Sequence, residues 1–578
     1  MSCVERGTAG SDRMQPVGTS FHALRKSNTL VLEQSEDIAM RCRRITKAAL
    51  VRGCGVRILM LLLVASFASR AALASAHEEQ AGPLRVGWAM TDLTPDGPVH
   101  IAAGSSLRVS EGVMDPIMAT VLVLESVADD GSGDVLIMVG CDLAIIRNEL
   151  RDRVRHLVAT SQPQIDVEKI VLNAMHNHGA PCVRTDPELA AELAEYGLDV
   201  PAEWSYYGVA PDEQTMSPVG FLEFAAPRIA AAIGDAWNSR KPGGVSFGLG
   251  HAVVSHNRLV AYRDGRSRQF GSLDRPDFSH IEGYEDHSVG LLYTYDAGGE
   301  LTGVVVNVPC AAWGMGSRIT ADFWHETRRE LRRRLGESLY VLQQVAASAE
   351  QWPMALVDRR AEQRMEKITG RTRREEIAVR IADAVTSVLP YMHDQIGWNP
   401  TFVHRVEQIQ LSRQGLAEGE VESRRRDFER LLGEYRKMWQ EIEENPRIRE
   451  RPKWFEKISG VYWSLARAAR VLREFELRKS EPTVPVEVHA VRIGEMAIAT
   501  FPLAPYLDFG IQIKARSKAV QTFTVQTAAG HYRYLPTERS VAGGAYGAVP
   551  ESIVFGPQGG RELVEGTLEL IESLWAEK

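Results

Sequence analysis

The feature that most limits how this 578-residue chain can fold is a series of short apolar runs separated by turn signals and a helix pattern. Two strand-like runs, Ile117–Glu125 and Val135–Gly140, precede a helix pattern at Glu149–Ser161 and a third run at Ile170–Leu172. The order strand, strand, helix, strand is typical of a sheet with helices packed on its faces. We therefore expect an α/β (α+β) domain, in which a mixed β-sheet core is flanked by helices.

The same kinds of pattern continue along most of the chain. Leu301–Cys310 contains a run of valines, which predicts a strand buried on both faces. Strand patterns return after residue 480, and we expect them to join one sheet system with the earlier strands. The other predicted elements are helices at Phe221–Asn238, Ala321–Arg334 and Glu562–Ala576, and strands at Leu84–Thr94, Val245–Val254, His287–Tyr295, Leu339–Ala347, Val486–Ile493, Met496–Phe501 and Gln521–Gln526.

The segment 358–480 differs in character from the rest, since charged residues are denser there and glycine is rarer. Its apolar residues recur at helical spacing, for example at Phe428, Leu431, Leu432, Tyr435, Met438 and Trp439. This predicts a helical subdomain at 358–480, inserted between two parts of the α/β domain at 77–357 and 481–578. The helices either pack on the domain's own surface or form a coiled coil with a partner.

The N-terminal region 1–76 has the pattern of a secretory signal. Basic residues precede the apolar run Ile58–Ala65, and Ala74-Ser75-Ala76 forms a small-residue cleavage site. The apolar run is too short to span a membrane. We expect cleavage after Ala76 and export to the periplasm or the medium, with no transmembrane segment in the mature form. Because the basic region is long, Met40 is an alternative translation start.

The net charge argues against a nucleic-acid-binding protein, and the cysteine content argues against a fold held together by disulfides. The net charge is −8 with no long single-sign run, which argues against a nucleic-acid partner. Cys141, Cys182 and Cys310, the cysteines after the predicted cleavage site, lie in or beside apolar runs, which predicts buried free thiols rather than disulfides. The pattern specifies no oligomeric state.

Candidate chemistry first appears in the stretch Ile170–Cys182. A buried strand there ends in His176-Asn177-His178, just before Gly179-Ala180-Pro181. Alternate residues of an extended segment point to the same side, so we expect both imidazoles to face one pocket. Imidazole together with carboxylate is a donor set that suits zinc. The alternative is a pair of unrelated loop histidines, and spacing alone supplies no third ligand.

Several motifs, taken in their order from about residue 84 to 575, resemble the neutral/alkaline, non-lysosomal ceramidase family. They are Gly87-Trp88-Ala89 with Asp92–Pro95, the segment Asn173–Pro181, the pair Asn257-Arg258, the segment from Val306-Asn307 to Ala321-Asp322-Phe323, and Tyr534–Glu538 with Tyr546. This joint order is far more specific than any single motif. The resemblance implies the family's catalytic-domain fold, and we expect no C-terminal immunoglobulin-like domain because the sequence ends at Lys578.

The family's members are zinc amidases that split the N-acyl bond of ceramide, a step of sphingolipid metabolism. The resemblance implies that His176 and Tyr534 are zinc ligands. It implies that His178 is a catalytic histidine, and that Arg258 and Tyr546 contact the substrate head. A zinc cofactor and a small-molecule or lipid-like substrate are therefore the expected partners.

Three positions depart from the family pattern. Ala311 stands at the second zinc histidine, Ala504 at the zinc glutamate, and Trp352 at the serine before proline. Alanine has no donor atom and indole offers no acceptor, so two of the four family zinc ligands are missing. A metal site in this chain would need substitute donors, for which the sequence offers Asp142, His178, Asp322 and His325.

These observations predict an exported, ceramidase-like hydrolase of amide (N-acyl) bonds with a divergent metal site. The alternative is a catalytically inactive ceramidase-fold binding protein, a pseudoenzyme. A third hypothesis is a structural or interaction protein that works through the segment 358–480.

Overall fold

The computed structural model describes residues 84–127, 133–314 and 316–576. The signal region expected at 1–76 lies outside these residues. Among the helices in the described ranges, none is both long enough and apolar enough to cross a membrane.

The larger of two main sheets has eight strands in the order β12-β11-β10-β5-β1-β2-β3-β4. It is mixed, since β3–β4 and β11–β12 pair in parallel while the other neighbours are antiparallel. The strands are β1 (Arg85–Asp92), β2 (Met118–Glu125), β3 (Val135–Cys141), β4 (Ile170–Ala174), β5 (Lys241–His251), β10 (Ser288–Asp296), β11 (Leu301–Val308) and β12 (Tyr340–Val345). The valine run of β11 is buried on both faces, as predicted.

The later strands form a second sheet, which corrects our expectation of one sheet system. Its order is β14-β15-β16-β18, with β14 at Phe402–Ser412, β15 at Thr483–Ile493, β16 at Met496–Thr500 and β18 at Gln521–Val525. The two sheets share an apolar layer, to which β15 contributes Val491 and Ile493 while Val486 and Val488 belong to another core. A strand with two apolar faces records burial, but it does not record which partner covers each face.

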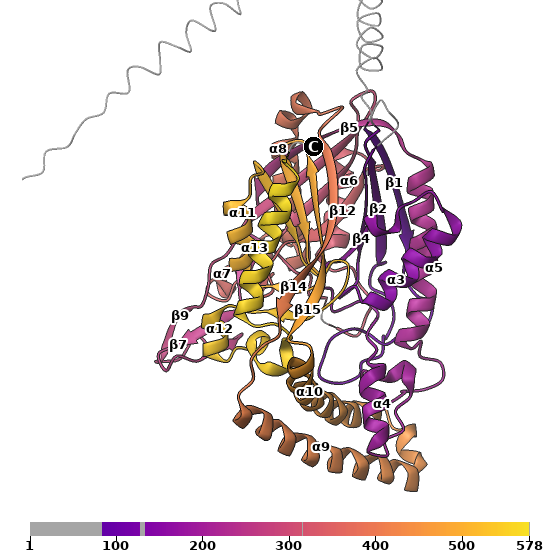
Figure 1. Cartoon of the computed structure of the whole chain (residues 1–578), viewed down its shortest axis with the longest axis vertical. Helices are drawn as coiled ribbons and strands as arrows, with labels where there is room; N and C mark the ends of the chain where they lie inside the picture. The colour runs from indigo at the N-terminus through magenta and orange to yellow at the C-terminus, as the bar shows by residue number, and fades with distance from the viewer. Residues whose placement is uncertain (1–83, 128–132, 315, 577–578) are drawn as a thin grey trace, which may run out of the picture. The chain divides into compact units, whose positions relative to one another are not determined.

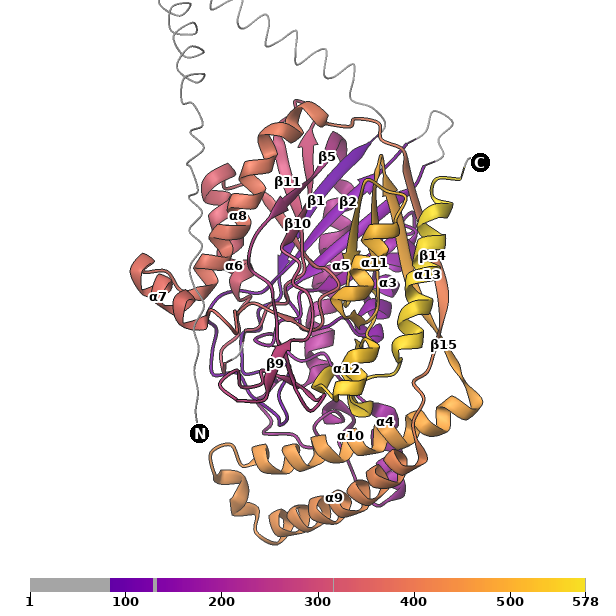
Figure 2. The same cartoon turned by 90° about the vertical axis from the view of Figure 1, so that its left-hand side faces the viewer.

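Helices cover the outer face of each sheet, so the fold has four layers (Figures 1 and 2). On the larger sheet these are α3 (Asn148–Ser161), α5 (Pro218–Asn238), α6 (Phe323–Leu335) and α8 (Arg373–Met392). On the smaller sheet they are α11 (Leu507–Arg516) and α13 (Pro557–Ser573). The predicted class, a mixed sheet core flanked by helices, is confirmed.

The segment 358–480 is only partly the helical insertion that we expected. Its first helices are α7 (Arg359–Thr369) and α8, and α8 packs on the larger sheet. Its strand β14 pairs with β15 from Phe402↔Ile493 to Ser412↔Thr483. We did not predict β14, because as an edge strand it alternates buried residues with exposed charged ones such as Glu407.

Two long helices, α9 (Glu418–Glu444) and α10 (Phe455–Ser480), form a hairpin beyond the ends of both sheets (Figures 1 and 2). Their apolar faces pack on each other and on α4 (Pro187–Glu195) and its neighbours. The hydroxyl of Tyr435 donates to the Gly208 carbonyl at 2.7 Å, and that of Tyr462 to the Ser205 carbonyl at 2.9 Å. The chain itself therefore covers the faces that a coiled-coil partner would need.

A buried polar chain joins α3 to both sheets. Arg155 donates two bonds to the Glu487 carboxylate, at 2.8 and 3.1 Å, and one to the Ile170 carbonyl. The ring of His489 lies between Glu487, at 2.9 Å, and the ring of His404, at 3.0 Å. Burial alone would raise the pKa of Glu487, but the bonds from His489 and Arg155 outweigh it and hold this pKa at about 2.

The three described cysteines, Cys141, Cys182 and Cys310, are free and buried. This confirms the prediction of packed thiols, and the layers described above hold together without disulfides among these residues.

Candidate functional site

The loop after β4 turns sharply at His176, whose φ is 60°. This left-handed conformation is uncommon for a residue other than glycine, and the side chain of Asn177 holds it. The Asn177 amide donates to the carbonyls of Thr320 and Asp142, and its oxygen accepts from the Gly179 N–H at 2.9 Å. The turn is thus clamped on three sides.

This turn corrects the expectation that both histidines face one pocket. His176 lines a pocket, whereas His178 packs against the ring of Trp313, with centroids 4.5 Å apart. The two imidazoles remain neighbours, with centroids 5.0 Å apart. The alternation rule fails here because the chain leaves the extended conformation at His176.

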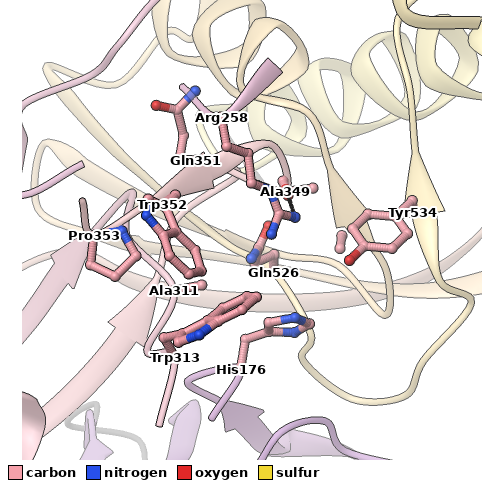
Figure 3. Close-up of a pocket in the computed structure, with 11 residues that line it drawn as sticks. His176, Arg258, Ala311, Trp313, Ala349, Gln351, Trp352, Pro353, Gln526 and Tyr534 are labelled. Atoms are coloured by element: carbon pink, nitrogen blue, oxygen red, sulfur yellow. Dashed lines mark hydrogen bonds between the residues drawn. The ribbon is translucent and has the colours of Figure 1, made fainter. Parts of the chain in front are cut away.

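The pocket beside His176 gathers side chains from segments far apart in the sequence. In Figure 3, Trp313 and Trp352 stand on one side and Tyr534 on the other, with His176 and Arg258 between them. The lining residues are His176, Arg258, Ala311, Trp313, Ala349, Gln351, Trp352, Pro353, Ala504, Gln526 and Tyr534. The free space is a cavity of ≈ 10 Å³, which is about the room that one water needs.

Aromatic side chains take up most of the space on one side. The rings of Trp313 and Trp352 are 3.9 Å apart between centroids, and Phe270 lies 4.4 Å from Trp352. Arg258 lies over the Phe270 ring at 5.8 Å. Ligand pockets usually measure roughly 300–1,000 Å³, so this aromatic wall leaves a closed pocket in the conformation described.

Arg258 is fixed by the segment that carries Trp352. Its Nη2 donates to the Ala349 carbonyl at 2.6 Å, and its backbone N–H donates to the Glu350 carbonyl at 3.0 Å. Its Nε, also buried, has no hydrogen-bond partner among the described residues. Arg258 can therefore donate one further bond from Nε.

Glu350, whose carbonyl accepts the backbone N–H of Arg258, is almost fully buried. Both of its carboxylate oxygens lie 3.0 Å from the Leu507 N–H. Burial raises the pKa of Glu350 to about 7, against the opposing effects of its backbone hydrogen bonds and of Arg258. The protonation of this carboxyl group thus changes near neutral pH.

Both histidines are neutral at physiological pH. Burial, followed by the charges of Arg258 and Arg184, lowers the pKa of His176 to about 3. Burial and the neighbouring His176 lower the pKa of His178 well below its ordinary value. The Nδ1 of His176 is buried, and none of the described residues bonds to it. This nitrogen is available to a ligand.

Of the five site residues expected from the sequence, three line the pocket and two lie beside it. His176, Arg258 and Tyr534 line it. His178 lies beside the pocket, because its ring contacts the rings of the lining residues His176 and Trp313. Tyr546 is 43% exposed, and its ring lies 6.2 Å from that of Tyr534.

The three positions that depart from the family pattern, Ala311, Trp352 and Ala504, also line this pocket. The donor set does not fit a catalytic zinc, which typically takes three protein ligands, because the lining supplies only His176 and Tyr534. In the described ranges, no group of three or more His, Cys, Asp or Glu side chains is arranged to hold a metal ion.

The substitute donors that we considered do not line the pocket. Asp142 is fully buried in an ion pair with Arg328 at 2.5 Å. Asp322 accepts the backbone N–H groups of Trp313 and Gly314, at 2.7 and 3.0 Å, and so holds the loop that carries Trp313. His325 lies on α6, outside the pocket lining.

Sequence reasoning missed the residues that close the pocket, chiefly Trp313, Phe270 and Gln526. Nothing in their local sequence separates them from ordinary core residues. Trp313 could have been found, because it lies two residues after Ala311 in a segment that the family motifs single out.

Comparison with profiles of protein families and with curated proteins finds no match for this sequence. Solved structures do match. A neutral ceramidase from Pseudomonas aeruginosa superposes with a TM-score of 0.55, and a ceramidase complexed with C2 with a TM-score of 0.56. In both cases the identity is 16%, and the match covers 86% of this chain and 76% of the other. This chain has the neutral ceramidase fold.

The neutral ceramidase fold confirms the family resemblance at the level of architecture. At 16% identity the likeness speaks for the fold, and chemistry must be argued from the site. In this version of the ceramidase fold, the pocket keeps a histidine, an arginine and a tyrosine beside two alanines and a tryptophan.

Proposed function

We propose that this protein hydrolyses N-acyl amide bonds of lipid-like compounds in the pocket beside His176. The observation that carries the proposal is convergence. Positions that the motif order singled out, scattered between residues 176 and 534, line one small pocket in a ceramidase fold. They are His176, Arg258, Ala311, Trp352, Ala504 and Tyr534.

Three of the polar side chains that line the pocket, His176, Arg258 and Tyr534, support a hydrolysis that does not use a metal. A water molecule attacks the amide carbonyl carbon, and its proton passes to the neutral His176. The Nε of Arg258 and the hydroxyl of Tyr534 donate to the carbonyl oxygen as it becomes negative. The intermediate then breaks its C–N bond, and the amine leaves with the proton from His176. Because an imidazole with a pKa of about 3 is a weak base, we expect slow turnover.

A substrate reaches this site only when the aromatic wall moves, since the cavity of ≈ 10 Å³ holds about one water. Phe270 is the outermost of the three rings, 38% exposed. Its φ of 52° places it in a sparsely populated backbone region. Displacement of Phe270 and Trp352 would open an apolar channel suited to an acyl chain.

The second candidate function is binding of the same ligands without catalysis. Ala311, Ala504 and Trp352 favour it, because they replace two metal ligands and a hydroxyl with groups that perform no acid–base or nucleophilic chemistry. For either function we further propose that the protein is exported, on the signal pattern of residues 1–76.

The test uses the expected mature protein, residues 77–578, purified without added zinc or chelator. N-acyl amides of several chain lengths, ceramide among them, are incubated with wild type, His176→Ala and the control His156→Ala, and released amine is measured by mass spectrometry. His156 is an exposed residue of α3. We expect release by wild type and the control, and at least a tenfold loss in His176→Ala.

Ligand binding measured in parallel by calorimetry separates the two functions. Binding without amine release would replace the hydrolase with the binding protein. If the protein neither binds these amides nor releases amine from them, both functions are overturned.

A further inference from the structure

A cluster of arginines lies near the pocket, close enough for the charge of one of them, Arg184, to act on His176. Arg184, in the loop after β4, donates from Nη1 to the Tyr206 hydroxyl at 2.6 Å. Arg470, from α10, faces the same tyrosine, so the guanidinium carbons of Arg184 and Arg470 lie 5.2 and 5.5 Å from the centre of the Tyr206 ring. Two cations therefore share one aromatic side chain.

The loop that precedes Tyr534 adds a third arginine and a histidine to this cluster. Arg533 adopts a φ of 70°. Burial, followed by the charge of Arg470, lowers the pKa of Arg533 to about 10. Burial, followed by the charge of Arg184, lowers the pKa of His531 well below its ordinary value. The cations of this cluster repel one another.

Several buried nitrogen atoms of the cluster lack partners. Arg470 is only 6% exposed, and its Nη2 has no hydrogen-bond partner in the described part of the chain. The same holds for the Nη1 of Arg533 and the Nδ1 of His531. Buried polar groups are almost always hydrogen-bonded, so the unpartnered guanidinium nitrogens of Arg470 and Arg533 indicate a ligand that accepts hydrogen bonds.

The acidic residues nearby do not neutralise the cluster. Asp186 lies 3.5 Å from Arg470, but it is shared with Arg473 at 3.6 Å. Glu474 is paired with Arg413 at 2.5 Å. Arg184 and Arg533 form no ion pair with any described residue. Burial and the charge of Arg470 disfavour the charge of Arg533, so a bound anion would relieve the repulsion.

The cluster also borders the reacting groups. The charge of Arg184 contributes to the lowered pKa of His176. Arg533 also directly precedes Tyr534, which lines the pocket. A ligand with its amide beside His176 could thus place a charged group against the arginines.

We propose that Arg184, Arg470 and Arg533 form a binding site for a compact anion, a carboxylate or a phosphate, carried by the ligand of the neighbouring pocket. Guanidinium groups bind both anions through paired N–H donors. The ligand would then be an anionic N-acyl compound, such as an N-acyl amino acid or a phosphorylated N-acyl amino alcohol, rather than an uncharged one. The N-acyl part rests on the proposed function, whereas the anion site rests on the cluster alone.

The test compares ligands that share an acyl chain and differ in charge. The probes are N-dodecanoylglycine, N-dodecanoyl-O-phosphoethanolamine and the uncharged N-dodecanoylethanolamine, with inorganic phosphate as a fourth. Calorimetry at low chloride measures binding to the mature protein. We expect at least tenfold tighter binding of one anionic probe than of the uncharged one, and its identity tells carboxylate from phosphate.

Variants assign the effect to the cluster. Arg470→Gln and Arg533→Gln should each reduce the preference for the anionic probe at least fivefold. Lys479→Gln removes an exposed charge from the same helix and should leave the preference unchanged. Arg470→Lys keeps the charge but lacks the paired N–H donors of the guanidinium group. It provides a folded comparison if the glutamine variants unfold.

Equal affinity of wild type for charged and uncharged probes would overturn the anion site, as would an unchanged preference in both arginine variants. His176→Ala keeps this proposal separate from the hydrolase. It should lose amine release and still prefer the anion, so a failure of hydrolysis leaves the anion site intact.

Discussion

Trp313 and Trp352 pack edge to face on one side of the pocket, with ring centroids 3.9 Å apart and planes at 76°. Trp352 stands at the position where the family motif has a serine, and Trp313 stands on the loop that carries Ala311. The pair therefore fills most of one side of the pocket beside His176. Under the proposed function, ligand entry requires this aromatic pair to separate.

Trp352→Ala should open the pocket. Loss of a buried tryptophan costs about 3–5 kcal/mol of unfolding free energy, and affinity for long-chain N-acyl ligands should rise because the wall no longer has to move. Trp204→Ala is the matched control, since Trp204 is also 6% exposed and lies in the core under α9 and α10. The control should lose similar stability in urea unfolding with ligand affinity unchanged. Equal affinity in both variants would show that the wall is no barrier.

Zinc binding should be recovered by restoring the two missing donors. Ala311 and Ala504 line the same pocket as His176 and Tyr534, so Ala311→His with Ala504→Glu completes the family's ligand set. We expect less than one zinc per chain in wild type and in each single variant, and about one in the double variant. Adding His176→Ala to the double variant should remove the metal. Stoichiometric zinc in wild type, measured by plasma mass spectrometry, would contradict our reading of the donor set.

Glu487→Gln should destabilise the protein strongly at neutral pH. The change leaves the buried Arg155 with only the exposed Glu168, at 3.6 Å, as an acidic partner among the described residues, and breaking a buried pair costs about 3–5 kcal/mol. Because the folded pKa of Glu487, about 2, lies below its unfolded value, the stabilisation is present above the unfolded pKa and disappears as the pH falls towards 2. Urea unfolding at several pH values measures it. Glu565→Gln, which breaks the exposed pair with Arg516, should have little effect.

Glu350 should make the protein less stable as the pH rises. Its folded pKa of about 7 lies above its unfolded value, so the folded state holds a proton that the unfolded state releases. Stability should therefore fall between the unfolded pKa and neutrality, by about 1–3 kcal/mol. Glu350→Gln should flatten this part of the pH profile, and the exposed Glu429→Gln should not. An identical slope in wild type and Glu350→Gln would disprove the assignment.

Apolar periodicity predicted the strands well, because burial leaves a direct trace in the sequence. Ile170–Leu172 became β4, and Leu301–Cys310 became β11. The division into two sheets was not predictable in the same way, since Val486 and Val491 of β15 are equally apolar and face different cores. Strand β14 was not predicted, because its exposed face is charged and the helices around it dominate the local composition.

Only the site residues that lie in family-like motifs could be predicted from the sequence. The order of the family segments pointed to His176, Arg258 and Tyr534, and the alanines and the tryptophan beside them came from the same comparison. The arginine cluster left no such signal. Arg184, Arg470 and Arg533 lie on three separate segments, and each resembles an ordinary surface arginine until the chain is folded.

The hairpin of α9 and α10 leaves the smaller sheet at Ser412 and returns at Thr483, and these two residues are direct partners in the β14–β15 ladder. A segment whose ends meet in this way can be lengthened, shortened or replaced by mutation while the ladder keeps its register. Arg470 lies on that segment, whereas His176 and Tyr534 lie outside it. If the proposed anion site holds, changes in this one segment would alter which charged groups bind while His176 and Tyr534 stay unchanged.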